Sequence, residues 1–183
     1  GDWSSDVCSS DLFSCGVMDA LLDQDVMFPY CIGVSAGAAD SASYISRQKE
    51  RNLNMLLRYR NDKRYMGLRN YFKKEHSLFG VDFVFRKMPN VLFPFDMDTF
   101  QNYAGDYVVV TTDANTGKPH YFHKEDVDDR FDVICASCAL PVYFQAVHIG
   151  GGVYYDGGVS DPVPIRRLQR DGHHKALIVL TRP

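Results

Sequence analysis

The sequence has 183 residues, of which 45% are hydrophobic and 23% are charged, a length and composition typical of one globular domain. These values exclude a disordered chain, a collagen and a coiled coil, and no stretch approaches the ~18 consecutive apolar residues of a membrane-spanning helix. The net charge of −3 gives no electrostatic reason to expect nucleic acid as a partner. Five cysteines, an odd and small number, predict free thiols in a reducing compartment, so we expect a cytoplasmic protein.

The first twelve residues, GDWSSDVCSSDL, are polar and lack the periodicity of a helix or of a signal peptide. They resemble the translation of a sequencing adapter. We therefore predict a non-native or disordered segment at 1–12, followed by a single domain at 13–183. A buried strand predicted at 175–181 runs almost to the last residue with no helix to cover it, so we expect a domain that is incomplete at both ends.

Apolar spacing predicts strands that alternate with helices, which indicates a three-layer α/β domain. The segment 51–104 has the composition of an irregular, aromatic-rich excursion. The strands at 106–112 and 118–122 form a hairpin around an Asn-Thr-Gly turn. The predicted helices are 13–24, 36–47, 126–139 and 164–170, and the other predicted strands are 28–34, 146–149, 153–155 and 175–181.

Residues 33–37 read Gly-Val-Ser-Ala-Gly, a G-x-S-x-G motif between a predicted strand and a predicted helix. The arrangement is typical of a nucleophile elbow, in which a sharp turn presents the hydroxyl of Ser35 while the flanking Gly33 and Gly37 avoid side-chain clashes. The N-terminus of the helix, with the backbone N–H of Ala36, favours developing negative charge. We predict Ser35 as a nucleophile; the alternative is an incidental serine in a glycine-rich turn.

A serine hydroxyl needs a base, and the chain offers two kinds of candidate. Asp156 follows a short predicted strand and precedes Gly157 and Gly158, which let the backbone approach another loop closely. Its carboxylate can accept the serine proton directly, although Asp-Gly-Gly is also common in tight turns. The other candidate is a Ser-Asp-His triad in which His173 or His174, late in the chain, acts as the base.

Two more segments complete a pattern. Residues 136–141 read A-S-C-A-L-P, and D-P-V-P follows the D-G-G sequence at 161–164. Together with the G-x-S-x-G motif, they make residues 13–183 similar to the patatin-like phospholipase family. The resemblance implies an α/β/α sandwich with a mostly parallel central sheet that hydrolyses acyl esters of lipids such as phospholipids. It implies Ser35 as nucleophile, Asp156 as general base, a covalent acyl–serine intermediate, and no metal or cofactor.

The sequence departs from the family at one place. The glycine-rich oxyanion loop of the family, with the first strand before it, should lie immediately before Phe13, where the adapter-like residues stand. The N–H of Ala36 is then the one oxyanion donor that the motifs offer, and we expect this chain to be weakly active or inactive while its natural parent is active. A lipid-binding or partner-binding module of patatin shape, without catalysis, is the non-enzymatic alternative.

A basic segment at 47–74 holds ten Lys and Arg against Glu50 and Asp62, with tyrosines interspersed. It predicts peripheral contact with an anionic membrane; the alternative is a solvated helix face. The apolar segments 77–85 and 91–95 either line an acyl pocket or pack in the core. The C-x-x-C at 135–138 and the H-x-x-H at 120–123 lack further ligands at metal-binding spacing, so we predict no metal site.

Overall fold

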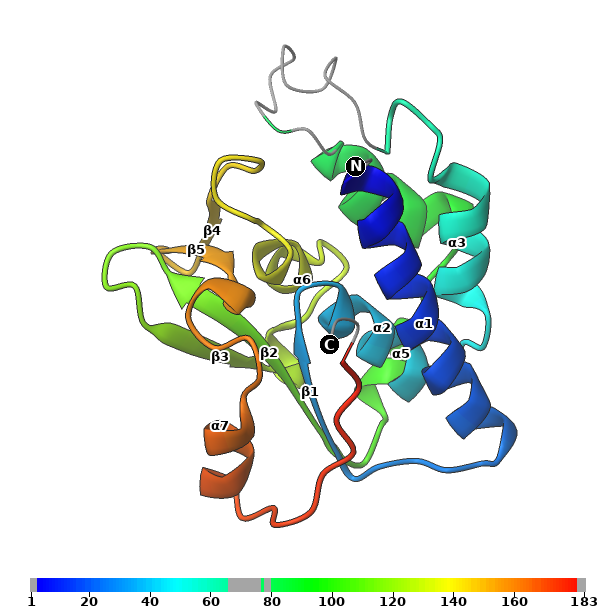
Figure 1. Ribbon diagram of the computed structural model, residues 1–183, viewed down its shortest axis with the longest axis vertical. Helices are drawn as coiled ribbons and strands as arrows, with labels where there is room; N and C mark the ends of the chain where they lie inside the picture. The colour runs from blue at the N-terminus through cyan, green and yellow to red at the C-terminus, as the bar shows by residue number, and fades with distance from the viewer. Residues whose placement is uncertain (1–2, 66–76, 78–79, 181–183) are drawn as a thin grey trace.

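A computed structural model describes residues 3–65, 77 and 80–180, with the backbone alone for 3–11 (Figure 1). A five-stranded sheet forms its centre, with helices on both faces. The strands are β1 (Tyr30–Val34), β2 (Asp106–Asp113), β3 (Pro119–His123), β4 (Val147–Ile149) and β5 (Gly152–Asp156). Among the described residues, no helix combines the length and the apolar character needed to cross a membrane.

The middle strand, β2, organises the sheet. β3 runs antiparallel along residues 108–112 of one edge. The other edge is shared by two strands: β1 pairs in parallel with residues 106–110, and β5 pairs antiparallel with residues 111–113. Because β1 and β5 run in opposite directions along this edge, their carboxyl ends meet between Val110 and Thr111. Residues that leave these two strands are therefore brought together.

The core lies between the sheet and the helices α2 (Ala36–Ile45) and α6 (Asp132–Ser137). Val108, Val109 and Val110 are completely buried, as expected for a central strand covered on both faces. Outside α2 pack α1 (Trp3–Asp23) and α3 (Arg51–Tyr59), which form a second, smaller cluster with the π-helix η1 (Phe83–Leu92). The short helix α5 (Met97–Gln101) also packs on α2.

The helix α7 (Ile165–Arg170) lies on the opposite side of the sheet and contacts β3 through Arg167. Phe122 of β3 belongs to the main core, and neighbouring residues of a strand point to opposite faces. Tyr121 therefore faces away from that core, and the guanidinium of Arg167 in α7 lies 4.6 Å from the centre of its ring. The α/β/α layering expected from the sequence is confirmed (Figure 1).

The expectation of a mostly parallel sheet is only partly borne out by the described strands, since β1 with β2 is the one parallel pair among them. The connections explain this result. Short turns join β2 to β3 and β4 to β5, and a short turn can link strands only in antiparallel orientation. Gly150 and Gly151, both with positive φ, make the second of these turns. The long helical connection from β1 to β2 permits the parallel pair.

Several predicted elements need correction. Residues 3–12 continue α1 in the N-terminal direction, because no glycine or proline interrupts them and each added residue extends an existing helix by one hydrogen bond. The segment 51–104 contains α3, η1 and α5 where we expected an irregular excursion, since amphipathic packing stabilises helices that local spacing did not show. The helix predicted at 126–139 is confined to Asp132–Ser137, after a left-handed residue at Phe131.

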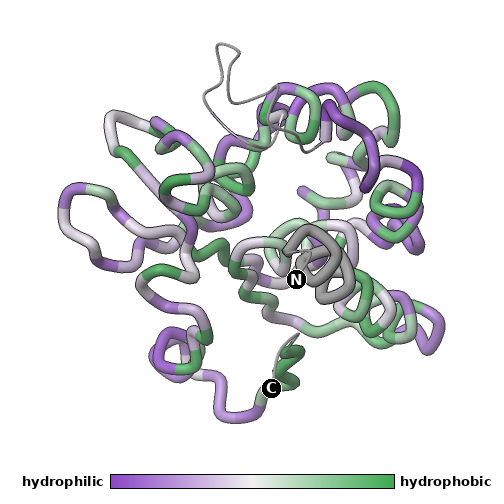
Figure 2. Tube along the Cα trace, turned by 45° about the horizontal axis from the view of Figure 1, so that its top comes forward, coloured by the Kyte–Doolittle hydropathy of each residue, from purple (hydrophilic) through white to green (hydrophobic). Residues whose placement is uncertain are grey.

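The strand predicted at 175–181 is also absent from its described part, 175–180, which is irregular. This segment lies beside the free edge of β1, and the two form opposite walls of the same cavities without pairing as strands. Figure 2 shows it as one of the most apolar stretches, yet Leu177 and Leu180 are 56% and 57% exposed. Without a paired backbone or a buried face, an apolar sequence does not suffice to make a strand.

Candidate active site

Ser35 sits in the sharp turn between β1 and α2. Its backbone angles, φ 56° and ψ −131°, lie in a region that side chains other than glycine rarely adopt, as expected of a strained functional turn. The turn brings α2 against β1 so closely that a Cβ on Gly33 would come within 2.5 Å of the Cα of Ala38. At Gly37 a Cβ would meet nothing within 4 Å. The expectation that a side chain would clash at both glycines is therefore confirmed at Gly33 and wrong at Gly37.

The hydroxyl of Ser35 does not cap the helix. Serine at this position usually accepts a hydrogen bond from the first turn of the helix, but here its Oγ makes no such contact. The hydroxyl instead donates to Oδ2 of Asp156, with 2.8 Å between the two oxygens. The geometry therefore places a hydroxyl and a carboxylate of two distant segments in direct contact, with no group between them.

Asp156 is the last residue of β5, and its side chain is buried, with 1% of the residue exposed. Its Oδ1 accepts a 2.7 Å hydrogen bond from the N–H of Gly158. The β5 end packs directly on β2: a Cβ on Gly157 would lie 2.2 Å from the carbonyl oxygen of Val110. Burial raises the pKa of Asp156, and the hydrogen bonds from Gly158 and Ser35 partly oppose that rise.

Two further hydroxyls connect this pair to β2. Ser137, at the end of α6, accepts a 2.9 Å hydrogen bond from the backbone N–H of Ser35 and donates to the carbonyl of Val110 at 2.7 Å. Thr112 donates to the backbone carbonyl of Asp156, also at 2.7 Å. In the sequence, Ser137 is one residue of the A-S-C-A-L-P motif with no role assigned to it, and no motif includes Thr112. Their hydrogen bonds depend on long-range pairing that no local pattern reveals.

A cavity of about 710 Å³ opens in front of Ser35 and Asp156. Its walls are mainly apolar and come from β1, from residues 159–165 and from residues 176–180. Ala36, the first residue of α2, lines the same cavity, and the N–H groups of a first helical turn have no acceptor within the helix. The cavity thus combines a half-buried hydroxyl bonded to a buried carboxylate, the positive end of a helix and an apolar wall.

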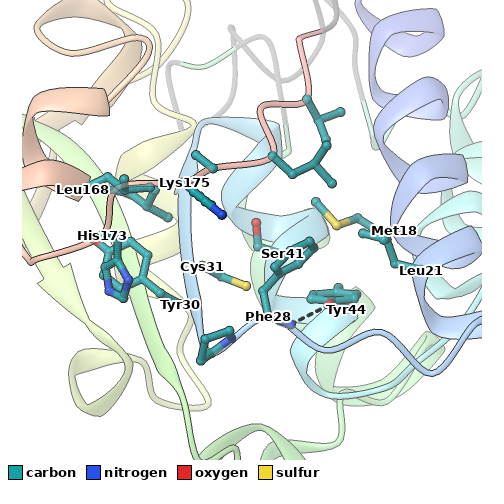
Figure 3. Close-up of a pocket in the computed structure, with 15 residues that line it drawn as sticks. Met18, Leu21, Phe28, Tyr30, Cys31, Ser41, Tyr44, Leu168, His173 and Lys175 are labelled. Carbon is teal, nitrogen blue, oxygen red and sulfur yellow. Dashed lines mark hydrogen bonds between the residues drawn. The ribbon is translucent and has the colours of Figure 1, made fainter.

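A second cavity of about 320 Å³ continues along β1 and shares lining residues with the first. Figure 3 shows Met18 and Leu21 of α1 on one side of it and Leu168 and His173 on the other. The two cavities follow the free edge of β1 from its last residue back to its first.

The two candidate histidines, His173 and His174, lie away from Ser35. The ring of His173 lies tilted against that of Tyr30, the first residue of β1, with 4.3 Å between centres. Ser35 follows the last residue of the same strand, roughly 13–17 Å away at about 3.3 Å per residue. Neither His173 nor His174 lines the cavity in front of Ser35. The structure brings together Ser35 and Asp156 and gives the triad alternative no support.

The described part of the basic segment, 47–65, is partly paired within the protein. Arg47 forms an ion pair with Asp25 at 3.0 Å and Arg64 with Asp62 at 2.7 Å. Arg51 is half-buried and donates to the carbonyl of Phe93. Arg58 and Arg60 are exposed beside Leu57, which is 52% exposed. Residues 66–74 of this segment lie outside the described residues.

The remaining sequence motifs have structural positions. Cys15, Cys31, Cys135 and Cys138, the cysteines whose side chains the structure describes, form no disulfide bond. The described residues also contain no group of three or more side chains that could hold a metal ion. Phe83 and Phe85 are buried in the two core clusters. None of the described residues in 77–95 lines the cavity in front of Ser35, and Leu92 and Phe95 pack against the core clusters, whereas Val91 is exposed.

This fold and site define a class of protein. The family model for patatin-like phospholipases matches residues 12–168, and the chain belongs to this family of lipid acyl hydrolases. It is 27% identical over 179 residues to "Uncharacterized protein YjjU" of Escherichia coli (strain K12), an alignment that covers 94% of this chain. The same alignment covers 49% of that protein, so the chain spans about half the length of this relative.

Proposed function

We propose that Ser35 and Asp156 form a catalytic dyad that hydrolyses the acyl ester bonds of lipids. The observation that carries this proposal is the 2.8 Å hydrogen bond from the Ser35 hydroxyl to a buried carboxylate, made from a strained turn at a helix N-terminus. A general base must lie within hydrogen-bond reach of the proton that it removes, and Asp156 does so without an intermediary. Its raised pKa also makes it a better base than an ordinary carboxylate.

The reaction runs in two halves. In the first, Asp156 takes the proton of Ser35 as Oγ attacks the ester carbonyl; the tetrahedral intermediate then collapses, and the departing alcohol takes the proton from Asp156. In the second, Asp156 removes a proton from water, which attacks the acyl–serine ester; the fatty acid leaves, and the proton returns to Ser35. The N–H of Ala36 at the positive end of α2 stabilises the negative oxygen in both tetrahedral intermediates.

The apolar walls in front of Ser35 suit the acyl part of the substrate, which a phospholipid or another acyl ester supplies. We further propose that this protein is cytoplasmic. It reaches such substrates by peripheral contact with a membrane through the segment 47–74. The exposed Arg58 and Arg60 beside Leu57 support this proposal, because cations flanking an exposed apolar side chain favour an anionic lipid surface.

A fluorophosphonate probe, which reacts with activated serines, tests the dyad. We expect one site of labelling that Ser35→Ala abolishes and that Asp156→Asn slows by about 10²-fold or more. The matched control is Ser46→Ala, which removes another buried hydroxyl just after the same helix without touching the cavity. The double variant His173→Ala/His174→Ala should label at the parent rate.

Other outcomes select the alternatives. Loss of labelling in the histidine double variant would support the Ser-Asp-His triad instead of the dyad. Because this chain is expected to be weakly active at most, labelling is followed over long exposure. A folded chain that still shows no labelling dependent on Ser35 would contradict the enzyme and favour a patatin-shaped binding module. Hydrolysis of p-nitrophenyl butyrate by the same variants provides an independent measure of turnover.

A further inference from the structure

We propose that Ser137 is a positioning residue that holds Ser35 in its reactive conformation through the backbone. This inference rests on the proposed function of Ser35. Ser137 is completely buried, and its one hydroxyl bridges two elements: it accepts from the N–H of Ser35 and donates to the carbonyl of Val110. Nothing in the geometry gives Ser137 contact with the reacting hydroxyl, so its action is indirect.

The position of this bridge explains its need. The pairing of β1 with β2 ends at Val34 and Val110, and the positive φ of Ser35 turns the chain away from β2 at the next residue. The N–H of Ser35 therefore leaves the sheet just where a partner on β2 would be due. The Ser137 hydroxyl takes the place of a direct hydrogen bond between the two strands. It accepts from the N–H of Ser35 and donates to the carbonyl of Val110, and so links β1 to β2 one residue beyond their last pair.

The donors and acceptors present fix the direction of the two hydrogen bonds of Ser137. A serine hydroxyl has one proton, and the carbonyl of Val110 can only accept it. The lone pairs of Ser137 then face the N–H of Ser35, which can only donate. A side chain without an oxygen at position 137 would leave both a buried N–H and a buried carbonyl without this partner.

The same stretch of β2 also holds the base. Thr112, two residues beyond Val110, donates to the backbone carbonyl of Asp156. Both members of the dyad are thus fixed to one strand, Ser35 through Ser137 and Asp156 through Thr112. We infer that this common anchor sets the 2.8 Å separation between their side chains. Displacement of a reacting group by about 1 Å can slow a reaction about 10²-fold, so the anchor bears directly on rate.

The test compares Ser137→Ala, the hydroxyl-retaining Ser137→Thr and the control Ser46→Ala in the full chain. Amide hydrogen exchange at Ser35 is the first measurement and requires no reactivity. We expect the exchange in Ser137→Ala to be about tenfold faster or more, while amides of the buried strand β2 keep their rates and Ser46→Ala has no effect at Ser35.

The second measurement is the rate of labelling by the fluorophosphonate probe at increasing concentration. We expect Ser137→Ala to lower the limiting rate by about tenfold to 10²-fold with little change in the half-saturating concentration, and Ser137→Thr to restore part of it. A purely structural role would change thermal stability without this split.

The outcomes separate this inference from the proposed function. Unchanged exchange at Ser35 in Ser137→Ala, or a parent-like limiting rate in that variant, would overturn the role of Ser137. If the chain without substitutions is not labelled at Ser35, the proposed dyad is contradicted. The exchange measurement alone then decides whether Ser137 holds the turn. Faster exchange throughout β2 in Ser137→Ala would also overturn the inference, because it would show general loosening.

Discussion

Val34 and Asp156 end two strands that meet head to head on one edge of β2, paired to the neighbouring residues Val110 and Thr111. This relationship places Ser35, the next residue after Val34, against the carboxylate of Asp156, although the two are 121 positions apart in the chain. The dyad is therefore a product of strand pairing.

The raised pKa of Asp156 predicts how reactivity depends on pH. Only the ionised carboxylate can accept the Ser35 proton, so the labelling rate should rise with pH through an inflection above the ordinary value of 3.8. A pH–rate profile of probe labelling measures this inflection. Asp156→Asn should abolish it, and an inflection that survives in this variant would assign the titration to another group.

The same shift makes a prediction about stability. Because burial raises the pKa of Asp156 in the folded state, its contribution to stability is present at low pH and is lost as the pH rises through the folded-state pKa. Asp156→Asn should therefore keep or increase the thermal midpoint at neutral pH, and gain nothing below pH 3.8. Thermal unfolding at both pH values checks this, and a large loss at neutral pH would contradict it.

The two glycines of the elbow should respond differently to alanine. A Cβ at Gly33 meets backbone atoms of Ala38 at 2.5 Å, so Gly33→Ala should destabilise the fold by about 1–3 kcal/mol. A Cβ at Gly37 has open space in a helix, so Gly37→Ala should be neutral or stabilise it by up to about 1 kcal/mol. Urea denaturation measures the free energy of unfolding of the two variants. Equal losses of stability in both would contradict the close approach of Gly33 to Ala38.

The basic segment makes a prediction about membranes. Each cation near an anionic surface contributes about 1 kcal/mol, so Arg58→Ala/Arg60→Ala should weaken binding to vesicles of phosphatidylglycerol and phosphatidylcholine by about 30-fold. The matched control is Arg166→Ala/Arg170→Ala, which removes two exposed charges from α7. Vesicle sedimentation at low and high salt measures the effect. Equal weakening in both variants would mean that net charge alone matters.

The N-terminal segment can be tested by deletion. We propose that residues before the family match, which begins at residue 12, are dispensable for the domain. Leu12 itself packs on the second core cluster, so the shorter deletion stops at residue 11. Removal of residues 1–11 should leave the thermal midpoint unchanged, whereas removal of residues 1–15 also deletes the buried Cys15 and should lower it. A large loss in the shorter deletion would show that 1–11 belong to the fold.

The local features of this protein were readable from the sequence. The strand before Ser35, the helix after it and the hairpin of β2 with β3 follow from apolar spacing and turn residues, which act over a few positions. The family, now shown by a match over residues 12–168, was also indicated by short motifs at fixed places. The identities of Ser35 and Asp156 as a candidate pair came from the same motifs.

Tertiary structure decided the rest, because it depends on which distant segments pair. Strand order made the sheet mostly antiparallel among the described strands, left residues 175–180 unpaired beside β1 and placed His173 against Tyr30 instead of near Ser35. It also gave Ser137 its two partners, which lie on strands that meet it only after folding. The sequence by itself determined the chemical groups and the turns that present them. Their contact at 2.8 Å is decided by the backbone pairing of β1, β2 and β5, which residue spacing does not encode.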